Sequence, residues 1–106
     1  MSLLSLVLPA YDEEDNLEAL VAELRAVLPE LRPAWSVECV FVDDGSRDGT
    51  RAKMLQARQD HPDLGIRVVA LDRNWGLTAA MDAGFAAARG EVVATLDTDL
   101  QNDPAD

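Results

Sequence analysis

Residues 37–45 read V-E-C-V-F-V-D-D-G, and the expected fold follows from this stretch. Its mostly apolar residues do not alternate regularly with polar ones, which favours a strand buried on both faces, as in a parallel sheet. The aspartates and the glycine that follow are typical of a turn. Similar apolar runs lie at Leu4–Leu8, Ile66–Leu71 and Val92–Leu96. The sequence therefore predicts four short buried strands.

Helical patterns fill the intervals between these runs. Apolar residues recur with the helical period over residues 17–28 and again over 77–88, and residues 50–60 form a weaker helix candidate. Asp12 or Asp15 is expected to cap the first helix, and Pro29 and Pro33 are expected to close it off. Strands that alternate with helices predict an α/β fold, a Rossmann-like parallel sheet with flanking helices and right-handed crossovers.

Length and charge narrow the possible partners. The 106 residues are enough for a single domain, residues 1–106, and the formal net charge is −11. Such a chain has no basic stripe for a nucleic acid, and an anionic membrane surface would repel it, whereas a bound cation would be attracted. The single cysteine, Cys39, excludes an internal disulfide, and a reducing cytoplasm suits the sequence.

Acidic and polar side chains follow all four predicted strands. The segments are P-A-Y-D-E-E-D-N at 9–16, D-D-G-S-R-D-G-T at 43–50, D-R-N-W-G at 72–76 and D-T-D-L-Q-N-D-P at 97–104. In a parallel sheet these segments meet at one edge, where ligands bind. The alternative is that they serve only as turns and helix caps. Arg73 either pairs with a neighbouring aspartate or contacts a ligand phosphate.

Asp97 and Asp99 are two residues apart at the end of the fourth run. In an extended chain this spacing points both carboxylates to the same side, about 6.5–7 Å apart. The pair repels itself unless a cation lies between the two groups, and hard oxygen ligands favour Mg²⁺ or Mn²⁺. A metal that bridges these carboxylates to a pyrophosphate accounts for the charge, and the alternative is an acidic loop without a ligand.

Together these segments resemble the family 2 glycosyltransferases of the GT-A fold, and more narrowly their polyprenyl-phosphate branch. The resemblance is carried by V-L-P-A-Y-D-E-E-D-N at 7–16, V-D-D-G-S-R-D-G-T at 42–50, R-N-W-G at 73–76 with A-A-M-D-A-G at 79–84, and D-T-D-L-Q-N-D-P at 97–104. It spans nearly the whole chain. It implies that residues 1–106 are the amino-terminal, nucleotide-sugar-binding part of a longer catalytic domain.

The resemblance also implies roles for particular residues. Those that match the family's nucleotide-binding positions are Pro9, Tyr11, Glu13, Asp43 and Asp44, with Arg73 as a candidate for the phosphates. Asp97 and Asp99 match the catalytic D-x-D motif that holds Mg²⁺ or Mn²⁺ on the diphosphate, and Gln101 matches a glutamine near the phosphates or the acceptor. Leu77 departs from the family pattern, because many relatives carry Lys or Arg there, and so does the Q-N-D-P tail.

The implied reaction is metal-dependent, inverting transfer of a sugar from a UDP- or GDP-sugar to a polyprenyl phosphate such as dolichyl or undecaprenyl phosphate. The alternatives are a family 2 transferase that acts on a saccharide acceptor in polysaccharide or lipopolysaccharide synthesis, and a noncatalytic acidic α/β binding module. The full-length protein is expected at the cytoplasmic face of a membrane. Residues 1–106 alone are expected to be inactive and to self-associate through an exposed sheet edge.

Overall fold

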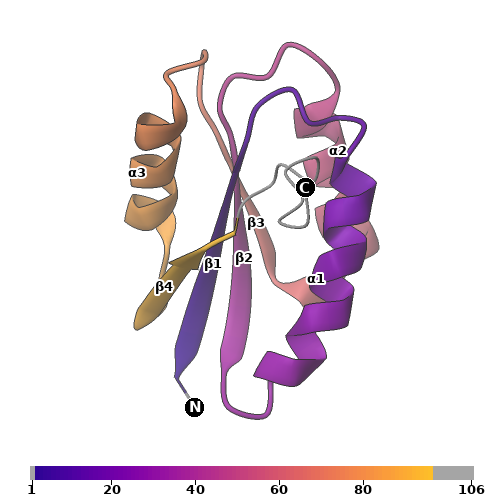
Figure 1. Cartoon of the computed structure of the whole chain (residues 1–106), viewed down its shortest axis with the longest axis vertical. Helices are drawn as coiled ribbons and strands as arrows, with labels where there is room; N and C mark the ends of the chain where they lie inside the picture. Colours follow the sequence, from indigo (N-terminus) through magenta and orange to yellow (C-terminus); the bar gives the residue numbers. More distant parts are fainter. Residues whose placement is uncertain (1, 97–106) are drawn as a thin grey trace, which may run out of the picture.

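A computed structural model describes residues 2–96 and gives a four-stranded parallel sheet flanked by helices (Figure 1). The strand order is β3-β2-β1-β4, and every neighbouring pair is parallel. The elements are β1 (Leu3–Ala10), α1 (Leu17–Leu31), β2 (Ser36–Asp43), α2 (Thr50–Asp60), the 3-10 helix η1 (Pro62–Leu64), β3 (Ile66–Ala70), α3 (Leu77–Ala87) and β4 (Val92–Thr95). The predicted α/β class and parallel sheet are confirmed.

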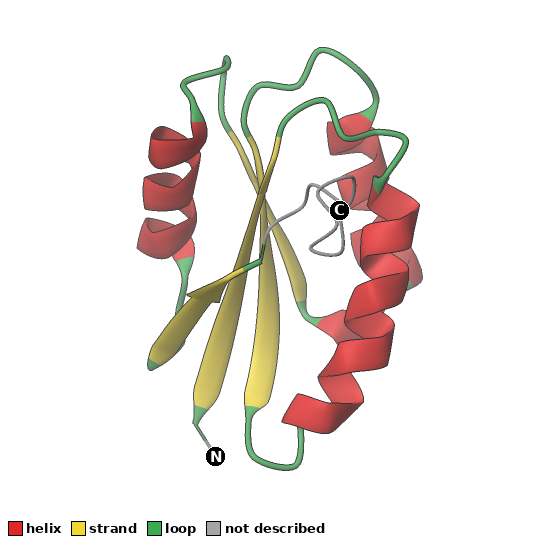
Figure 2. Ribbon diagram, viewed as in Figure 1, coloured by secondary structure: helices red, strands yellow, loops and turns green. Residues whose placement is uncertain are grey.

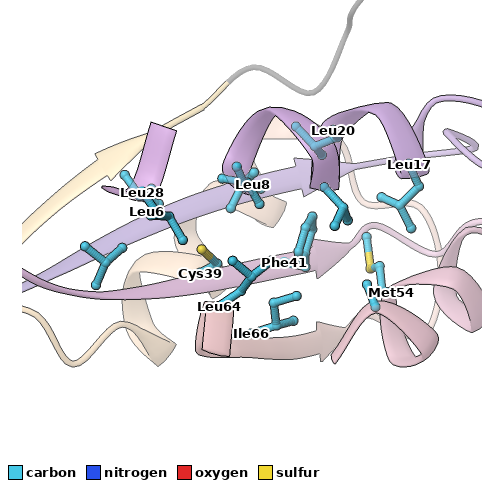
Figure 3. Close-up of a cluster of buried hydrophobic side chains, with 14 of the residues drawn as sticks. Leu6, Leu8, Leu17, Leu20, Leu28, Cys39, Phe41, Met54, Leu64 and Ile66 are labelled. Atoms are coloured by element: carbon cyan, nitrogen blue, oxygen red, sulfur yellow. The ribbon is translucent and has the colours of Figure 1, made fainter. Parts of the chain in front are cut away.

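The helices form a layer on each face of the sheet. Figure 2 shows α1 and α2 on one face and α3 on the other. The larger core lies under α1 and α2, where Leu8, Phe41 and Met54 are fully buried (Figure 3). Successive residues of a strand point to opposite faces of the sheet, so Val7 and Val42 on the central strands face α3 instead. Burial on both faces explains why the strand runs do not alternate with polar residues.

Glycine lets α3 lie close to the sheet. A Cβ atom built on Gly84 would lie 2.4 Å from Val7 Cγ1 and 3.0 Å from Val42 Cγ2, closer than side chains pack. The absence of a side chain at this position therefore sets the distance between α3 and the central strands. This distance matters for function because the first turns of α3 border the cleft described below.

Both ends of α1 differ from the sequence prediction. The residue at the start is Asn16, without a side-chain capping bond, and Asp12 instead accepts a hydrogen bond from the Arg47 amide. Pro29 lies inside α1, which continues to Leu31. Proline has a helical φ, and in the exposed last turn its missing N–H removes only one backbone bond, so the helix passes through it.

A buried carboxylate, that of Glu38, lies on the face of the sheet that α3 covers. Glu38 is 7% exposed and accepts hydrogen bonds from Ser5 Oγ (2.5 Å), the Arg89 amide (2.7 Å) and Arg67 Nη1 (3.2 Å). Burial alone raises the pKa of this carboxyl, but the three donors outweigh burial, so the pKa lies below its ordinary value of 4.5. The ionised form of Glu38 is therefore stabilised by folding.

The lowered pKa gives a pH prediction. A carboxyl whose pKa is lower in the folded than in the unfolded state stabilises the fold above the unfolded pKa, and this contribution is lost as pH falls. The free energy of unfolding should therefore fall more steeply below pH 4.5 in the wild type than in a Glu38→Gln variant. Urea unfolding at several pH values checks this. Parallel pH profiles for the two proteins would contradict it.

Strand β4 is the least buried strand. Val92, Val93 and Leu96, at and just beyond this strand, are 36–44% exposed. This strand lies at the edge of the described sheet, and the expected self-association through that edge stays a prediction. No helix within residues 2–96 is both long and apolar enough to cross a membrane.

Candidate active site

A cleft of about 380 Å³ opens at the carboxyl ends of β1, β2 and β4. This is the edge at which parallel α/β sheets bind ligands. The walls come from the loop after β1, the end of β2, the first turns of α3 and the end of β4. The lining residues are Pro9, Ala10, Tyr11, Glu13, Asp44, Leu77, Ala80, Met81, Thr95 and Leu96.

The structure brings together four of the predicted site residues, Pro9, Tyr11, Glu13 and Asp44. Two others, Asp43 and Arg73, are not among the cleft's lining residues. Asp97, Asp99 and Gln101 lie outside the described residues. The assignment of these residues to nucleotide, metal and acceptor stays a prediction.

The loop that carries Tyr11 and Glu13 is braced against the loop after β2. The Asp12 amide donates to Ser46 Oγ (2.9 Å), and the Glu13 amide donates to Thr50 Oγ1 (2.9 Å). Asp12 adopts a positive φ of 51°, which aspartate tolerates better than most residues. These bonds fix the backbone at Asp12 and Glu13, and the Glu13 carboxylate accepts a bond from Asn16 Nδ2 (2.9 Å). Contacts within the chain thus hold this wall of the cleft.

Asp44 organises a second wall. This residue is 4% exposed, and its carboxylate accepts bonds from the Trp75 amide (2.9 Å), the Gly76 amide (3.1 Å) and Asn74 Nδ2 (3.1 Å). These three donors belong to the R-N-W-G segment, which leads directly into α3. Asp44 therefore sets the path of the chain from β3 into α3, in addition to lining the cleft.

We expect an Asp44→Asn substitution to destabilise the fold by about 2–3 kcal/mol, because an amide NH₂ would replace one carboxylate oxygen and face either the Trp75 amide or both the Gly76 amide and Asn74 Nδ2, which need an acceptor. The matched control is Asp72→Asn, at an exposed carboxylate whose hydrogen bond within residues 2–96 comes from the Trp75 indole N–H (2.8 Å) of the same loop. Chemical unfolding followed by tryptophan fluorescence measures both. Equal stability losses in the two variants would contradict the role given to Asp44.

Asp43 is fully buried and holds the turn after β2. One carboxylate oxygen accepts the Ser46 amide (3.0 Å), and the other lies 2.8 Å from Arg51 Nε in an ion pair. These contacts match the alternative interpretation from the sequence, in which D-D-G-S-R-D-G-T forms a turn and opens a helix. Turn formation and the lining of the cleft thus fall on neighbouring aspartates of one segment.

Arg73 stacks on an aromatic ring beside the cleft. Its guanidinium carbon lies 3.9 Å from the centroid of the Trp75 ring, and both residues are exposed. One expectation was that Arg73 pairs with a neighbouring aspartate. Among residues 2–96, Arg73 makes this cation–π contact instead. The contact leaves the charge and the N–H donors of the guanidinium available to a ligand at this end of the sheet.

The apolar wall of the cleft was not predicted from the sequence. Leu77, Ala80 and Met81 follow the i, i+3, i+4 spacing that places residues on one face of a helix, so helical periodicity gave a signal for them. Thr95 and Leu96 gave none, because they read as the end of a buried strand. Leu77 is 64% exposed.

The charge of the cleft is negative. Glu13 and Asp44 are the ionisable carboxyl groups among the lining residues, and no lysine, arginine or histidine lines the cleft within the described part of the chain. Residues 2–96 also hold no group of three His, Cys, Asp or Glu side chains arranged to bind a metal ion. An anionic ligand would therefore need a cation from outside this lining set.

The model of glycosyl transferase family 2 matches residues 5–106. The chain belongs to glycosyl transferase family 2. Solved structures agree with the GT-A fold: a mannosyltransferase from Pyrobaculum calidifontis, in complex with GDP-Man and Mn²⁺, superimposes with a TM-score of 0.72 and 27% identity. That comparison covers 91% of this chain and 27% of the other.

Two curated relatives are more similar in sequence than the mannosyltransferase structure. A dodecaprenyl-phosphate galacturonate synthase from Rhizobium johnstonii is 45% identical over 97% of this chain. An undecaprenyl-phosphate 4-deoxy-4-formamido-L-arabinose transferase from Pseudomonas fluorescens is 46% identical over 94% of this chain. The chain spans 30% and 29% of the length of these two relatives.

Proposed function

We propose that this chain binds the nucleotide-sugar donor in an enzyme that transfers the sugar to a polyprenyl phosphate. The observation that carries the proposal is the preorganised acidic cleft at the carboxyl edge of the sheet, lined by Pro9, Tyr11, Glu13 and Asp44. The names of the curated relatives, which include a dodecaprenyl-phosphate and an undecaprenyl-phosphate enzyme, support the acceptor class.

The nucleoside lies in the described cleft in this proposal. Carboxylates accept hydrogen bonds from ring and exocyclic N–H groups, and both uracil and guanine offer such donors. Asp44 keeps acceptor capacity on Oδ1, to which one bond is assigned, and Glu13 also lines the cleft. The Tyr11 ring supplies a flat apolar surface for the base or ribose. GDP-Man in the related mannosyltransferase supports this class of ligand.

Asp97 and Asp99 would hold the divalent cation. They follow Leu96, which lines the cleft, and two carboxylates provide the hard oxygen donors that Mg²⁺ and Mn²⁺ prefer. When bound, the cation neutralises charge on the departing nucleoside diphosphate. The acidic lining makes this cation necessary, because Glu13 and Asp44 would otherwise repel the diphosphate. The related mannosyltransferase, whose complex includes Mn²⁺, supports a divalent metal.

The acceptor phosphate attacks the anomeric carbon in this reaction. A phosphate oxygen forms the new bond as the bond to the diphosphate breaks, so the anomeric configuration inverts. A phosphate is already ionised at neutral pH and needs little help from a general base, unlike a sugar hydroxyl. Gln101 is the candidate contact to the phosphates or the acceptor, and Arg73 is a candidate for the phosphates. The full-length protein would act at the cytoplasmic face of a membrane.

An acceptor assay tests this proposal. The full-length protein is incubated with Mn²⁺, a panel of UDP- and GDP-sugars, and undecaprenyl phosphate, and lipid-linked sugar is detected by mass spectrometry. We expect a glycosylated polyprenyl phosphate with one of the donors. Transfer to an oligosaccharide acceptor and none to the lipid phosphate would overturn the acceptor class and leave the donor site in place.

A further inference from the structure

A polar network lies on the α3 side of the sheet, at the opposite end from the cleft. Ser5 and Glu38 are register partners on β1 and β2, and both are buried. Ser5 Oγ donates to Glu38 (2.5 Å) and accepts a bond from the Gly90 amide (2.8 Å). Arg67 Nη1, from β3, contacts Glu38 (3.2 Å) and donates to the Ala87 carbonyl (2.6 Å). Three strands thus contribute side chains to one network.

This network holds the segment that joins α3 to β4. Its backbone partners are the Ala87 carbonyl and the amides of Arg89 and Gly90. The adjacent Glu91 amide donates to the Leu3 carbonyl (2.9 Å). A Cβ atom on Gly90 would lie 2.6 Å from Ser5 Oγ, so only glycine allows this close approach. Strand β4 begins two residues later, at Val92.

Among the described residues, strand β4 is otherwise positioned by its ladder with β1 and by the packing of Ala94 against the core. It has four residues, three of them exposed, and within the described sheet it pairs with β1 alone. Its register places Val92 beside Leu4 and Thr95 beside Val7. A slip by one residue would turn each of its side chains to the other face of the sheet. The strand leads into Thr95 and Leu96, which line the cleft.

We infer that Glu38, with Ser5 and Arg67, is a positioning residue that sets the register of β4 and thereby places the β4 wall of the cleft. This inference rests on the proposed function for its consequence, since the candidate metal ligands Asp97 and Asp99 follow that wall in the sequence. The network acts along the four-residue strand, a span of roughly 13 Å at the usual rise per residue. None of its three side chains lines the cleft.

Hydrogen exchange tests the register without any ligand. In Glu38→Gln and Ser5→Ala variants of the full-length protein, the amides of Glu91 and Leu96, which donate to β1 carbonyls, should exchange at least about tenfold faster. The Leu71 amide, which donates to the Asp43 carbonyl between β3 and β2, should be unchanged. The control is Asp82→Asn, at an exposed position of α3. Equal acceleration at all these amides, or none, would overturn the inference.

Nucleotide affinity tests the consequence at the cleft. Calorimetry of the same variants with UDP and GDP should show unchanged affinity without metal, because the loops after β1 and β2 are intact. The gain in affinity produced by Mn²⁺ should fall by about twofold to thirtyfold. A parallel fall in both affinities would indicate a merely structural role and overturn the inference. If the wild type binds no nucleotide, the proposed function fails, and hydrogen exchange alone decides the role of Glu38. Ser5→Ala, the milder change, keeps both tests available if Glu38→Gln does not fold.

Discussion

Replacing Asp97 and Asp99 together by asparagine is expected to lower kcat/KM for sugar transfer by at least about 1000-fold, because a metal supplies several kcal/mol of charge stabilisation in such reactions. The reason lies in the charges of the cleft. Its described lining carries the carboxylates of Glu13 and Asp44 and no basic side chain. No positive charge in this lining would therefore attract a diphosphate. Initial rates of the full-length protein over a range of Mn²⁺ concentrations measure the effect.

Asp103→Asn is the matched control for this double variant. It removes one carboxylate from the same acidic segment but lies outside the D-x-D pattern. We expect it to keep most of the activity. A double variant that is as active as Asp103→Asn at saturating Mn²⁺ would contradict the assignment of the metal to Asp97 and Asp99, and would direct attention to Arg73 as the group that balances the diphosphate.

The second large effect is expected at Gly45, on stability. Its φ is +69°, and a Cβ atom there would lie 2.1 Å from the carbonyl carbon of Arg73 and 2.4 Å from the amide nitrogen of Asn74. These neighbours are backbone atoms of the loop that Asp44 holds, so they cannot move aside without breaking its hydrogen bonds. A Gly45→Ala variant should therefore lose more than about 4 kcal/mol of unfolding free energy.

A Gly76→Ala variant separates the effect of the positive φ from the effect of the close contact with the neighbouring loop. Gly76 also has a positive φ, +100°, but a Cβ atom built there would meet nothing within 4 Å among the described residues beyond its chain neighbours. Only backbone strain should act there, with an expected loss of about 1–3 kcal/mol. Chemical unfolding of both variants gives the comparison. If Gly45→Ala is no less stable than Gly76→Ala, the close contact between the loops after β2 and β3 is not the constraint that we describe.

Most of the fold was predictable because the signals are local. The apolar runs, such as the one over residues 37–42, are long enough for strands. They alternate along the chain with helical patterns, and this order predicts an α/β fold. Helix ends were less predictable. Pro29 and Pro33 were expected to close α1, but the helix continues past the exposed Pro29 to Leu31, which packs against the core.

The site was partly predictable for the same reason. Parallel strands bring their carboxyl ends together, so Pro9, Tyr11, Glu13 and Asp44 could be expected at one edge, and they do line one cleft. Sequence could not separate Asp43 from Asp44, because adjacent aspartates look alike until the fold turns one toward Arg51 and the other toward the cleft. The network around Glu38 could not be predicted either, because its members are far apart in the sequence and lie within predicted strands.

The proposed function requires that this cleft bind a nucleoside diphosphate together with a divalent cation. Calorimetric titration of the full-length protein with UDP and with GDP, each with and without Mn²⁺, examines this binding without depending on an acceptor. We expect one binding site, preference for one of the two nucleotides, and affinity at least about tenfold higher with Mn²⁺. Absence of binding to both nucleotides in the presence of Mn²⁺ would contradict the proposal, as would affinity that is the same with and without the metal.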